Sequence, residues 1–354
     1  MSPRPLALLA ALALGCSPAP NASPRRYCVS GPEARDLLER AHGTLLLAPP
    51  DGTLEALSLP DAALRTALDS NAVSSVVRVA GPDRRGRFAV VAHSERERIH
   101  ALQRIDEHGR AELIFEGRGE FGDEAQLGQH VALDTSGELL AFVARPRPVH
   151  VGGADARRME GDLDLWRIEG REHWPTSLRA LDDSLEWFPG AKRLVFTAFV
   201  DREAARELRE RHVAQGDPFA SSSCDWKRVP VVHEFDFTRW TVRALHVGEH
   251  PLVAPDGRSI LLRDLDQNWR LFDLERNQSR AVQAPGAIWP GAVAFVDCET
   301  ALYWARPTEG VESHDDDAGA PRCALKLLDL RNGSFQTVVP SLDPRSRLSY
   351  APRP

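Results

Sequence analysis

Four residues in the C-terminal half of the chain have the spacing of a calcium-binding loop. Asp264, Asp266 and Asn268 stand at alternate positions, and Glu275 follows eleven residues after the first of them. Such a loop needs glycine at its sixth position, where the chain turns sharply, and this chain has Trp269 there. The stretch WRLFDL before the glutamate is typical of an extended strand, which cannot curl around one ion. We therefore expect turn residues that hydrogen-bond to their own backbone and no metal site.

Histidines and a cluster of acids offer two further possibilities for chemistry. His246 and His250 are four residues apart, but Gly248 and Pro251 predict a loop, where helical spacing has no meaning. The segment SHDDDAG, residues 313–319, predicts a solvated loop tip, because consecutive residues of an extended loop point apart. The motifs G-x-S-x-G, H-E-x-x-H and G-x-x-x-x-G-K-S/T do not occur in the sequence. We expect solvated histidines and no catalytic, cofactor-binding or metal-binding residues.

The stretch MSPRPLALLAALALGCSPAP at the start of the chain has the features of an export signal. One arginine precedes an apolar run from Leu6 to Leu14, which is shorter than the roughly 20 residues of a membrane-spanning helix. The ending ALGC resembles the bacterial lipobox, in which the cysteine is lipid-modified and becomes the new N-terminus. This resemblance implies a signal peptide over residues 1–15 and a lipidated Cys16. A plain secretory signal cut near SPAPNAS is the alternative.

The residues after the lipobox indicate a cellular location and its redox environment. Ser17 stands where lipoproteins retained at the inner membrane have aspartate, so the resemblance implies an anchor on the periplasmic side of a bacterial outer membrane. Disulfides persist in that compartment. No C-x-x-C motif occurs, and sequence leaves all three pairings of the remaining four cysteines open. We expect at least one disulfide among Cys28, Cys224, Cys298 and Cys323.

Composition predicts a folded chain without a nucleic-acid surface. The chain has 354 residues, of which 42% are apolar, enough for one large all-β domain or two ordinary ones. The formal charge is -7, and basic residues are interleaved with acidic ones. A basic patch of the kind that binds nucleic acid is therefore missing from the sequence.

After a polar linker, the sequence changes from one predicted helix to strands. Ser30 and Glu33 stand at capping-box positions and Gly43 follows the end, which predicts a short helix within residues 16–43. Later segments begin with a Pro, Gly or Asp turn, continue as a short apolar strand, and end in a second strand with an acidic residue. The hairpin of residues 44–61 is a shortened sixth unit. The five full units begin near Gly81, Leu133, Trp187, Ala254 and Ile288.

The strands after these turns are apolar at successive positions, as in FAVVA, LLAFVA, RLVFTAF and ALYWA. Such strands must be covered on both faces. Because regular helices are not predicted between them, the sheets must cover one another, as blades do around the axis of a propeller. A two-sheet sandwich would show clean alternation instead. We predict an all-β propeller of six blades over residues 44–345, followed by a C-terminal tail at 346–354.

Three of these units resemble a known repeat. APDGRSILLRDLDQNWRLFDLE, LDTSGELLAFVA and WFPGAKRLVFTA are similar to the WD40-like Pro-Asp-Gly repeat of the TolB propeller domain, in which a Ser-Pro-Asp-Gly-Lys turn precedes a strand such as Ile-Ala-Phe. The unit at 254–257 keeps the motif, whereas the unit at 187–190 lacks the aspartate. The resemblance covers residues 44–340 and implies a TolB-like six-bladed β-propeller lipoprotein. It implies little about function, because the repeat serves many roles.

Three units carry long inserts relative to the compact unit at 254–283. The inserts follow Ala144, Val200 and Ala305, between the second and third predicted strands. The second insert begins with residues 201–212, whose charge spacing predicts a solvated surface helix. In a propeller these turns emerge at one end of the ring, so we predict long inserts on one face. Elaborated loops on a rigid scaffold commonly carry binding function.

These features predict a lipid-anchored periplasmic propeller that acts as a non-enzymatic binding or scaffold protein in the cell envelope. The expected partner is an envelope protein or other cell-surface component on the insert-bearing face. Membrane contact is expected through the lipid anchor only. The alternative is a propeller enzyme, a lyase or hydrolase, that uses side chains around the central channel. Such an enzyme would need His, Glu or Asp on its innermost strands, where VALDTSG, LEWFPG and PLVAPDG are mostly apolar.

Overall fold

The computed structural model shows a ring of β-strands. The predicted signal peptide, Cys16 and the acidic segment at 313–319 lie outside the residues that the structure describes. The described residues are 37, 41–48, 54–59, 63–68, 76–80, 88–94, 99–105, 111–116, 127–150, 157–214, 227–283, 288–305, 323–342 and 347–352.

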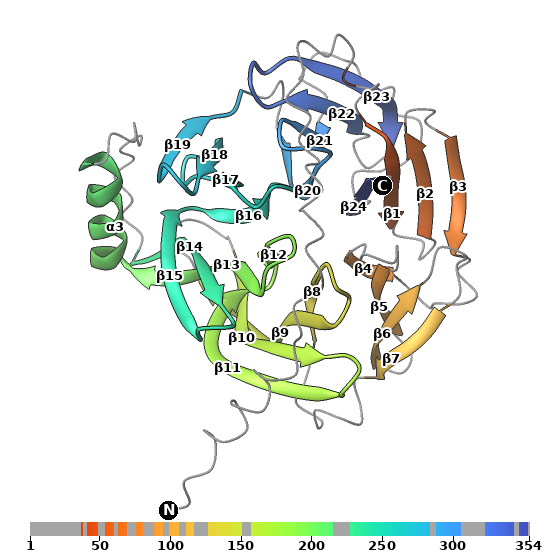
Figure 1. The fold of residues 1–354 in the computed structure, drawn as a ribbon, viewed down its shortest axis with the longest axis horizontal. Helices are drawn as coiled ribbons and strands as arrows, with labels where there is room; N and C mark the ends of the chain where they lie inside the picture. Colours follow the sequence, from red (N-terminus) through yellow and green to blue (C-terminus); the bar gives the residue numbers. More distant parts are fainter. Residues whose placement is uncertain are drawn as a thin grey trace, which may run out of the picture.

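Six four-stranded sheets surround a common axis in the described part of the chain (Figure 1). Each sheet is one blade, and its neighbouring strands are antiparallel. The first strand of each blade lies beside the axis and the last lies at the rim. This arrangement confirms the predicted all-β propeller of six blades.

The strands of each blade are given from the axis outward. Blades 1 to 3 contain β24 (Arg347–Pro352), β1 (Gly43–Ala48), β2 (Leu54–Leu59) and β3 (Ala63–Leu68); β4 (Val76–Ala80), β5 (Phe88–Ser94), β6 (Ile99–Ile105) and β7 (Ala111–Glu116); β8 (Leu127–Leu133), β9 (Leu139–His150), β10 (Arg157–Arg167) and β11 (Glu172–Leu181). Blades 4 to 6 contain β12 (Glu186–Trp187), β13 (Arg193–Asp201), β14 (Arg228–Asp236) and β15 (Thr241–Val247); β16 (Glu249–Val253), β17 (Ser259–Arg263), β18 (Trp269–Asp273) and β19 (Gln278–Ala281); β20 (Ile288–Phe295), β21 (Thr300–Ala305), β22 (Cys323–Asp329) and β23 (Phe335–Leu342). Helix α3 (Arg202–Ala214) lies between β13 and β14.

The two ends of the chain meet in blade 1. β24 is hydrogen-bonded along β1 in an antiparallel ladder of six residue pairs. The N-terminal part of the chain therefore supplies three strands of this blade, and the C-terminal part supplies the innermost one. The predicted tail at 346–354 must be corrected, because most of it closes the ring. The hairpin predicted at 44–61 is likewise part of a complete blade.

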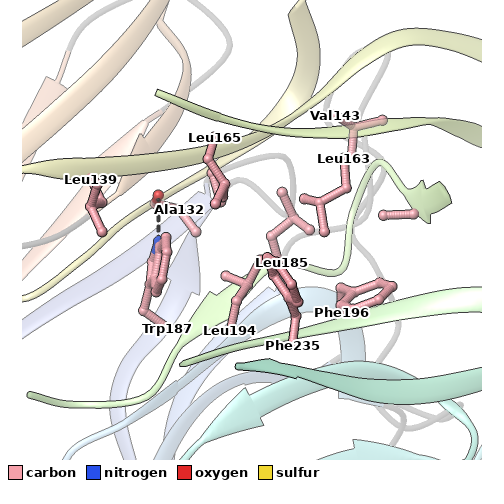
Figure 2. Close-up of a cluster of buried hydrophobic side chains, with 12 residues drawn as sticks. Ala132, Leu139, Val143, Leu163, Leu165, Leu185, Trp187, Leu194, Phe196 and Phe235 are labelled. Atoms are coloured by element: carbon pink, nitrogen blue, oxygen red, sulfur yellow. Dashed lines mark hydrogen bonds between the residues drawn. The ribbon is translucent and has the colours of Figure 1, made fainter. Parts of the chain in front are cut away.

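The blades cover one another, as Figure 2 shows for blades 3 and 4. Trp187 donates its indole N–H to the carbonyl oxygen of Ala132 at 2.9 Å, so its polar atom is satisfied within the apolar interface. Every residue of β21 is buried, as expected for a strand covered on both faces. The facing side chains of blades 3 and 4 include Leu139, Leu163, Leu165, Leu185, Leu194, Phe196 and Phe235.

The turns between the first and second strands share one geometry in blades 3, 4 and 5. Gly137, Gly190 and Gly257 have φ values of 74°, 66° and 68°. Glycine adopts this left-handed conformation without the clash that a side chain would cause. In blade 5 the N–H of Gly257 donates to the carbonyl oxygen of Ala254 at 2.8 Å. In these three blades the glycine turn therefore marks where the second strand begins.

The two ends of the ring differ. The turns between second and third strands emerge at one end, which we call the insert face. It carries the β9–β10 hairpin and α3, and there β21 ends and β22 begins. The opposite end, which we call the terminal face, carries the other turns within the blades, and there β1 begins and β24 ends. The inserts predicted in blades 3 and 4 are thus confirmed between the second and third strands, on one face, whereas the insert after Ala305 lies outside the described residues.

The segment before β1 packs against blade 6 on the terminal side. Leu37 is helical, and Leu37 and Ala41 are buried in one cluster with Val296, Leu302 and Trp304. Val296 directly follows β20, in its turn to β21. The rest of the predicted N-terminal helix lies outside the described residues. No helix within the described ranges is both long and apolar enough to cross a membrane.

Cys298, in the turn between β20 and β21, is disulfide-bonded. Cys323 begins β22 at the other end of the six-pair ladder between β21 and β22. Such a ladder spans about 17 Å, whereas the Cα atoms of a disulfide lie within about 7 Å of each other. Cys323 is therefore not the partner of Cys298. Cys28 and Cys224 lie outside the described residues.

The blade assignment predicts unequal effects for two substitutions in blade 5. Leu261 lies in β17 and is 2% exposed, so Leu261→Asp should bury an unpaired carboxylate between blades. The free energy of unfolding should fall by on the order of 3–5 kcal/mol. Asp266→Ala, in the exposed turn after β17, should lower it by about 1 kcal/mol or less. Urea unfolding measures both values, and equal losses would contradict the assignment.

Candidate functional site on the insert face

A long hairpin, β9–β10, extends from blade 3 on the insert face. Its register shifts between Glu160 and Asp162. Gly161 lies in that shift, and a Cβ atom there would collide with the carbonyl oxygen of Ala144. Glycine permits this close approach of the two strands, and the bulge bends the outer half of the hairpin. The bend allows Arg158 to reach side chains of other blades.

Blade 5 begins on the insert face with an unusual backbone. A Cβ atom on Gly248 would lie 2.6 Å from the carbonyl oxygen of Arg263, so only glycine fits between β15 and β16. The N–H of Gly248 donates to the carbonyl oxygen of Pro230 at 3.0 Å. His250 has φ 53°, a left-handed conformation that non-glycine residues keep only where their surroundings enforce it. The one-residue connection at Gly248 places Glu249 and His250 at the start of β16, the innermost strand of blade 5.

Arg158 joins blade 3 to that strand. Its Nη2 donates to both carboxylate oxygens of Glu249, at 2.8 and 2.9 Å. Its Nη1 donates to Oδ2 of Asp183, in the loop before β12, at 3.4 Å. Glu249 is 6% exposed, so this charge-assisted contact is better shielded from water than a surface ion pair. The contact joins two blades that are not neighbours in the ring, because blade 4 lies between them.

His250 is buried between two carboxylates. It is 5% exposed, its Nδ1 lies 3.7 Å from Asp183 and its Nε2 lies 3.7 Å from Glu249. Neither ring nitrogen has a hydrogen-bond partner among the described residues. Burial lowers the pKa of the neighbouring Arg263 from its ordinary value, and the charge of Glu249 opposes this change. Each ring nitrogen of His250 thus faces a carboxylate oxygen that can accept a hydrogen bond.

A second set of ion pairs ties the base of the hairpin to blade 4. Glu160 accepts hydrogen bonds from Nη2 of Arg228 at 3.1 and 3.3 Å. Asp162 accepts from Arg145 and Arg179, each at 2.7 Å. Burial acts to raise the pKa of Asp162, but the hydrogen bonds and charges of the two arginines outweigh it and hold this pKa below its ordinary value. Blades 3, 4 and 5 are therefore linked by charged contacts on the insert face.

The predicted turn after β17 is confirmed. Asp264 is 3% exposed and accepts the N–H of Asn268 at 2.9 Å and the Nε–H of Arg270 at 2.7 Å. Glu275 lies beyond β18 in the next turn, where its N–H donates to Asp273 at 2.9 Å. The carboxylate of Asp264 thus accepts hydrogen bonds from the backbone of its own turn and from an arginine side chain. Among the described residues no group of three or more His, Cys, Asp or Glu could hold a metal ion.

The prediction that His246 and His250 are solvated is wrong. His246 lies in β15, is 0% exposed, and its Nδ1 is 2.8 Å from the carbonyl oxygen of Val247. His250 lies in β16. Gly248 is the whole connection between these two strands, so the residues on either side of it are strand residues rather than loop residues.

Helix α3 confirms the helix predicted at 201–212, although one side of it is buried. Ala205 and Leu208 belong to a buried cluster with Val229 and Val231 of β14. Nε2 of His212 lies 2.7 Å from the carbonyl oxygen of Leu245 in β15. The helix is therefore docked on blade 4 and is not fully surrounded by solvent.

Sequence reasoning missed the cluster of Arg158, Asp183, Glu249 and Arg263. These residues come from four separate segments and meet because the β9–β10 hairpin of blade 3 extends far enough for Arg158 to contact Glu249 of blade 5. The innermost strand of blade 5 was predicted from Pro251 onward, so the two polar residues that begin it were left out. A glycine immediately before two polar residues and an apolar strand was the available signal.

No family model matches the chain, and no curated protein matches its sequence. Solved structures with a similar fold include TolB from Acinetobacter baumannii. Its TM-score is 0.58 and its identity 17%, and the match covers 88% of this chain and 67% of that one. The β-propeller domain of the Trilobed protease from Pyrococcus furiosus has a TM-score of 0.44 and 11% identity, covering 84% of this chain and 82% of that one. Oligogalacturonate lyase in complex with manganese has a TM-score of 0.47 and 10% identity, covering 81% and 70%. At these identities the likeness to TolB shows the fold alone, which is a TolB-like propeller.

The contact between Arg158 and Glu249 predicts a stability effect. Arg158→Ala leaves a buried carboxylate without its main partner, and the free energy of unfolding should fall by about 2–3 kcal/mol. The matched control is Arg206→Ala on α3, whose guanidinium is 61% exposed and lies 3.7 Å or more from its acidic partners. That change should cost about 0.5 kcal/mol or less. Urea unfolding compares the two, and a loss for Arg158→Ala no larger than the control would contradict the buried contact.

Proposed function

We propose that this chain is a non-enzymatic binding protein of the bacterial periplasm, anchored by lipid on Cys16 to the periplasmic side of the outer membrane. Its insert face holds an envelope protein or other cell-surface component. The observation that supports the binding role is that the long connections after β9, β13 and β21 all join second to third strands, whose ends lie at one end of the ring. The proposed location is supported by the leader sequence, with its apolar run and the ALGC ending.

The contacts of the insert face favour a firm platform over flexible loops. Arg158 fixes the outer half of the β9–β10 hairpin to blade 5, and Arg228 fixes its base to blade 4. Met159 lies between Arg158 and Glu160, the two hairpin residues that make these contacts, and is 39% exposed. Arg147 on the paired strand is also exposed. A partner that binds here meets side chains whose backbone is already ordered, which lowers the entropy lost on binding.

A second candidate function is an enzyme that uses His250 for proton transfer. Its support is the position of the imidazole between Asp183 and Glu249 beside the axis. A general base must reach the proton that it removes, and both ring nitrogens of His250 are buried from solvent. Glu249 is also held by both of its oxygens to Arg158. Binding is therefore the function that this geometry supports better.

The lipid anchor can be tested by the fate of Cys16. In the bacterium, the wild-type chain should partition with membranes and yield an acylated N-terminal peptide in mass spectrometry. Cys16→Ser should abolish the acylated peptide. The protein should then either leave the membrane fraction or fail to be processed to its mature form. Mature protein with an unmodified cysteine, or one cut near SPAPNAS, would refute the anchor while leaving the binding role to be judged separately.

The binding role can be tested by crosslinking in cells. A photoreactive amino acid at Arg147 or Met159 should trap a discrete envelope partner, because these exposed positions lie on the insert face. The same amino acid at Arg276, which is 79% exposed on the terminal face, should not trap it. A Met159→Lys variant should lose the crosslink formed from position 147 while its melting temperature stays unchanged. The same crosslinked species from both faces, or none from the insert face, would contradict the proposal.

A further inference from the structure

The terminal face carries two exposed aromatic side chains. Trp240 is 50% exposed and Phe335 is 47% exposed, and within the described residues they are the large aromatic side chains in the exposed class. Trp240 ends the turn between β14 and β15, and Phe335 follows the turn between β22 and β23. Both turns join third and fourth strands, so both side chains lie at the end of the ring opposite the inserts.

The backbone gives no reason for tryptophan at position 240. Its φ is 55°, and the equivalent turns of blades 3, 5 and 6 have Arg171 with φ 49°, Asn277 with φ 55° and Gly333 with φ 76°. Asparagine and glycine are the residues that adopt this left-handed conformation most readily, whereas a bulky aromatic residue is strained there. The backbone conformation therefore does not call for tryptophan, and the role of its ring lies in what the side chain contacts.

Other rings support Trp240 from one side. Its ring lies 5.2 Å from Phe235 in an edge-to-face arrangement and 5.8 Å from Phe237. Phe237 in turn is stacked at 5.4 Å on Trp174 of blade 3. The indole is held against this aromatic row, and half of its surface still faces outward. A supported and half-exposed tryptophan is suited to contact an apolar or interfacial medium.

The chain before β1 leaves the ring from the same face. Gly43 begins β1 at the terminal face, and Ala41 and Leu37 are buried beside the turn that follows β20. Cys16 precedes Leu37 by twenty-one residues in the sequence, a length that reaches at most about 75 Å when fully extended. The segment that leads from Cys16 therefore joins the ring on the terminal face.

We propose that the terminal face rests on the lipid surface to which Cys16 is anchored, with Trp240 and Phe335 in the headgroup region and the insert face turned away from the bilayer. The proposal rests on the anchor in the proposed function and goes beyond it, because the ring itself contacts lipid. Tryptophan is enriched at membrane interfaces, where its ring is apolar and its N–H meets water. The acyl chains supply most of the affinity, and the aromatic residues supply orientation.

The charges around these residues indicate how the contact is made. Arg239 beside Trp240 is 80% exposed and can reach lipid phosphate groups. In the next blade Arg276 and Glu275 are 79% and 71% exposed, so the face has both signs of charge. A contact that depended on net charge would weaken steeply with salt. We expect this one to depend on the aromatic residues and to change little between low and high salt.

Orientation can be measured without native acylation. The mature chain from residue 17, with an N-terminal histidine tag, is bound to vesicles of phosphatidylethanolamine and phosphatidylglycerol that contain a nickel-chelating lipid. A donor fluorophore on an introduced amino acid replaces either Arg276 on the terminal face or Arg206 on α3. Energy transfer to an acceptor on the lipid headgroups should be clearly greater from position 276. Equal transfer from both positions, or greater transfer from position 206, would overturn the proposal.

The aromatic contribution has a matched control. Without the chelating lipid, Trp240→Ser and Phe335→Ser should each lower the vesicle-bound fraction of the mature chain, by roughly fivefold in partition coefficient for tryptophan. Val213→Ser, which changes a 55% exposed apolar residue on α3, should leave it unchanged. Melting temperatures confirm that each variant is folded. Equal effects from Val213 and Trp240, or no effect from either aromatic change, would refute the lipid contact. These vesicle experiments do not depend on acylation of Cys16. A failure of the lipid anchor is detected separately, by the test of Cys16 in the native host.

Discussion

Closure of the ring is the constraint on which the rest of the structure depends. Each blade is apolar on both faces, so each must have a neighbour on both sides. Pairing of β24 with β1 completes blade 1 and allows it to cover blade 6. Leu45 and Leu59 of blade 1 are then buried in one cluster with Trp304 of blade 6. An open ring would expose this cluster and the outer faces of two blades, so the contribution of the closing ladder to stability exceeds that of its own hydrogen bonds.

Closure also creates the candidate site. Arg158, Asp183 and Glu249 are far apart in the sequence, and none of them belongs to a motif. They meet because Arg158 lies in the outer half of the long β9–β10 hairpin, whereas Asp183 precedes β12 and Glu249 begins β16, the innermost strands of blades 4 and 5. The same arrangement buries His250, so a polar cluster arises from the geometry of the ring and from glycines at positions 161 and 248.

The sequence allowed prediction of those features that depend on neighbours along the chain. Successive apolar residues such as those of β21 showed that strands are covered on both faces, and glycine turns such as that at Gly257 showed where second strands begin. Insert positions followed from comparing units of different length. β24 was missed because its partner β1 lies at the other end of the chain, and no local pattern records such a pairing. Glu249 and His250 were missed because one glycine, Gly248, forms a connection that resembles a loop in sequence and is a sharp entry into a strand in the structure.

The position of β1 in its sheet has a mechanical consequence. β1 is flanked by β24 on one side and β2 on the other, with ladders of six and five residue pairs. A force applied to the chain before Gly43 acts along the axis of this strand, so it loads both ladders in shear. Hydrogen bonds loaded in shear must break together, whereas an edge strand pulled sideways unzips one pair at a time. Tension that the N-terminal segment transmits to Gly43 therefore meets a strand that is hydrogen-bonded on both sides.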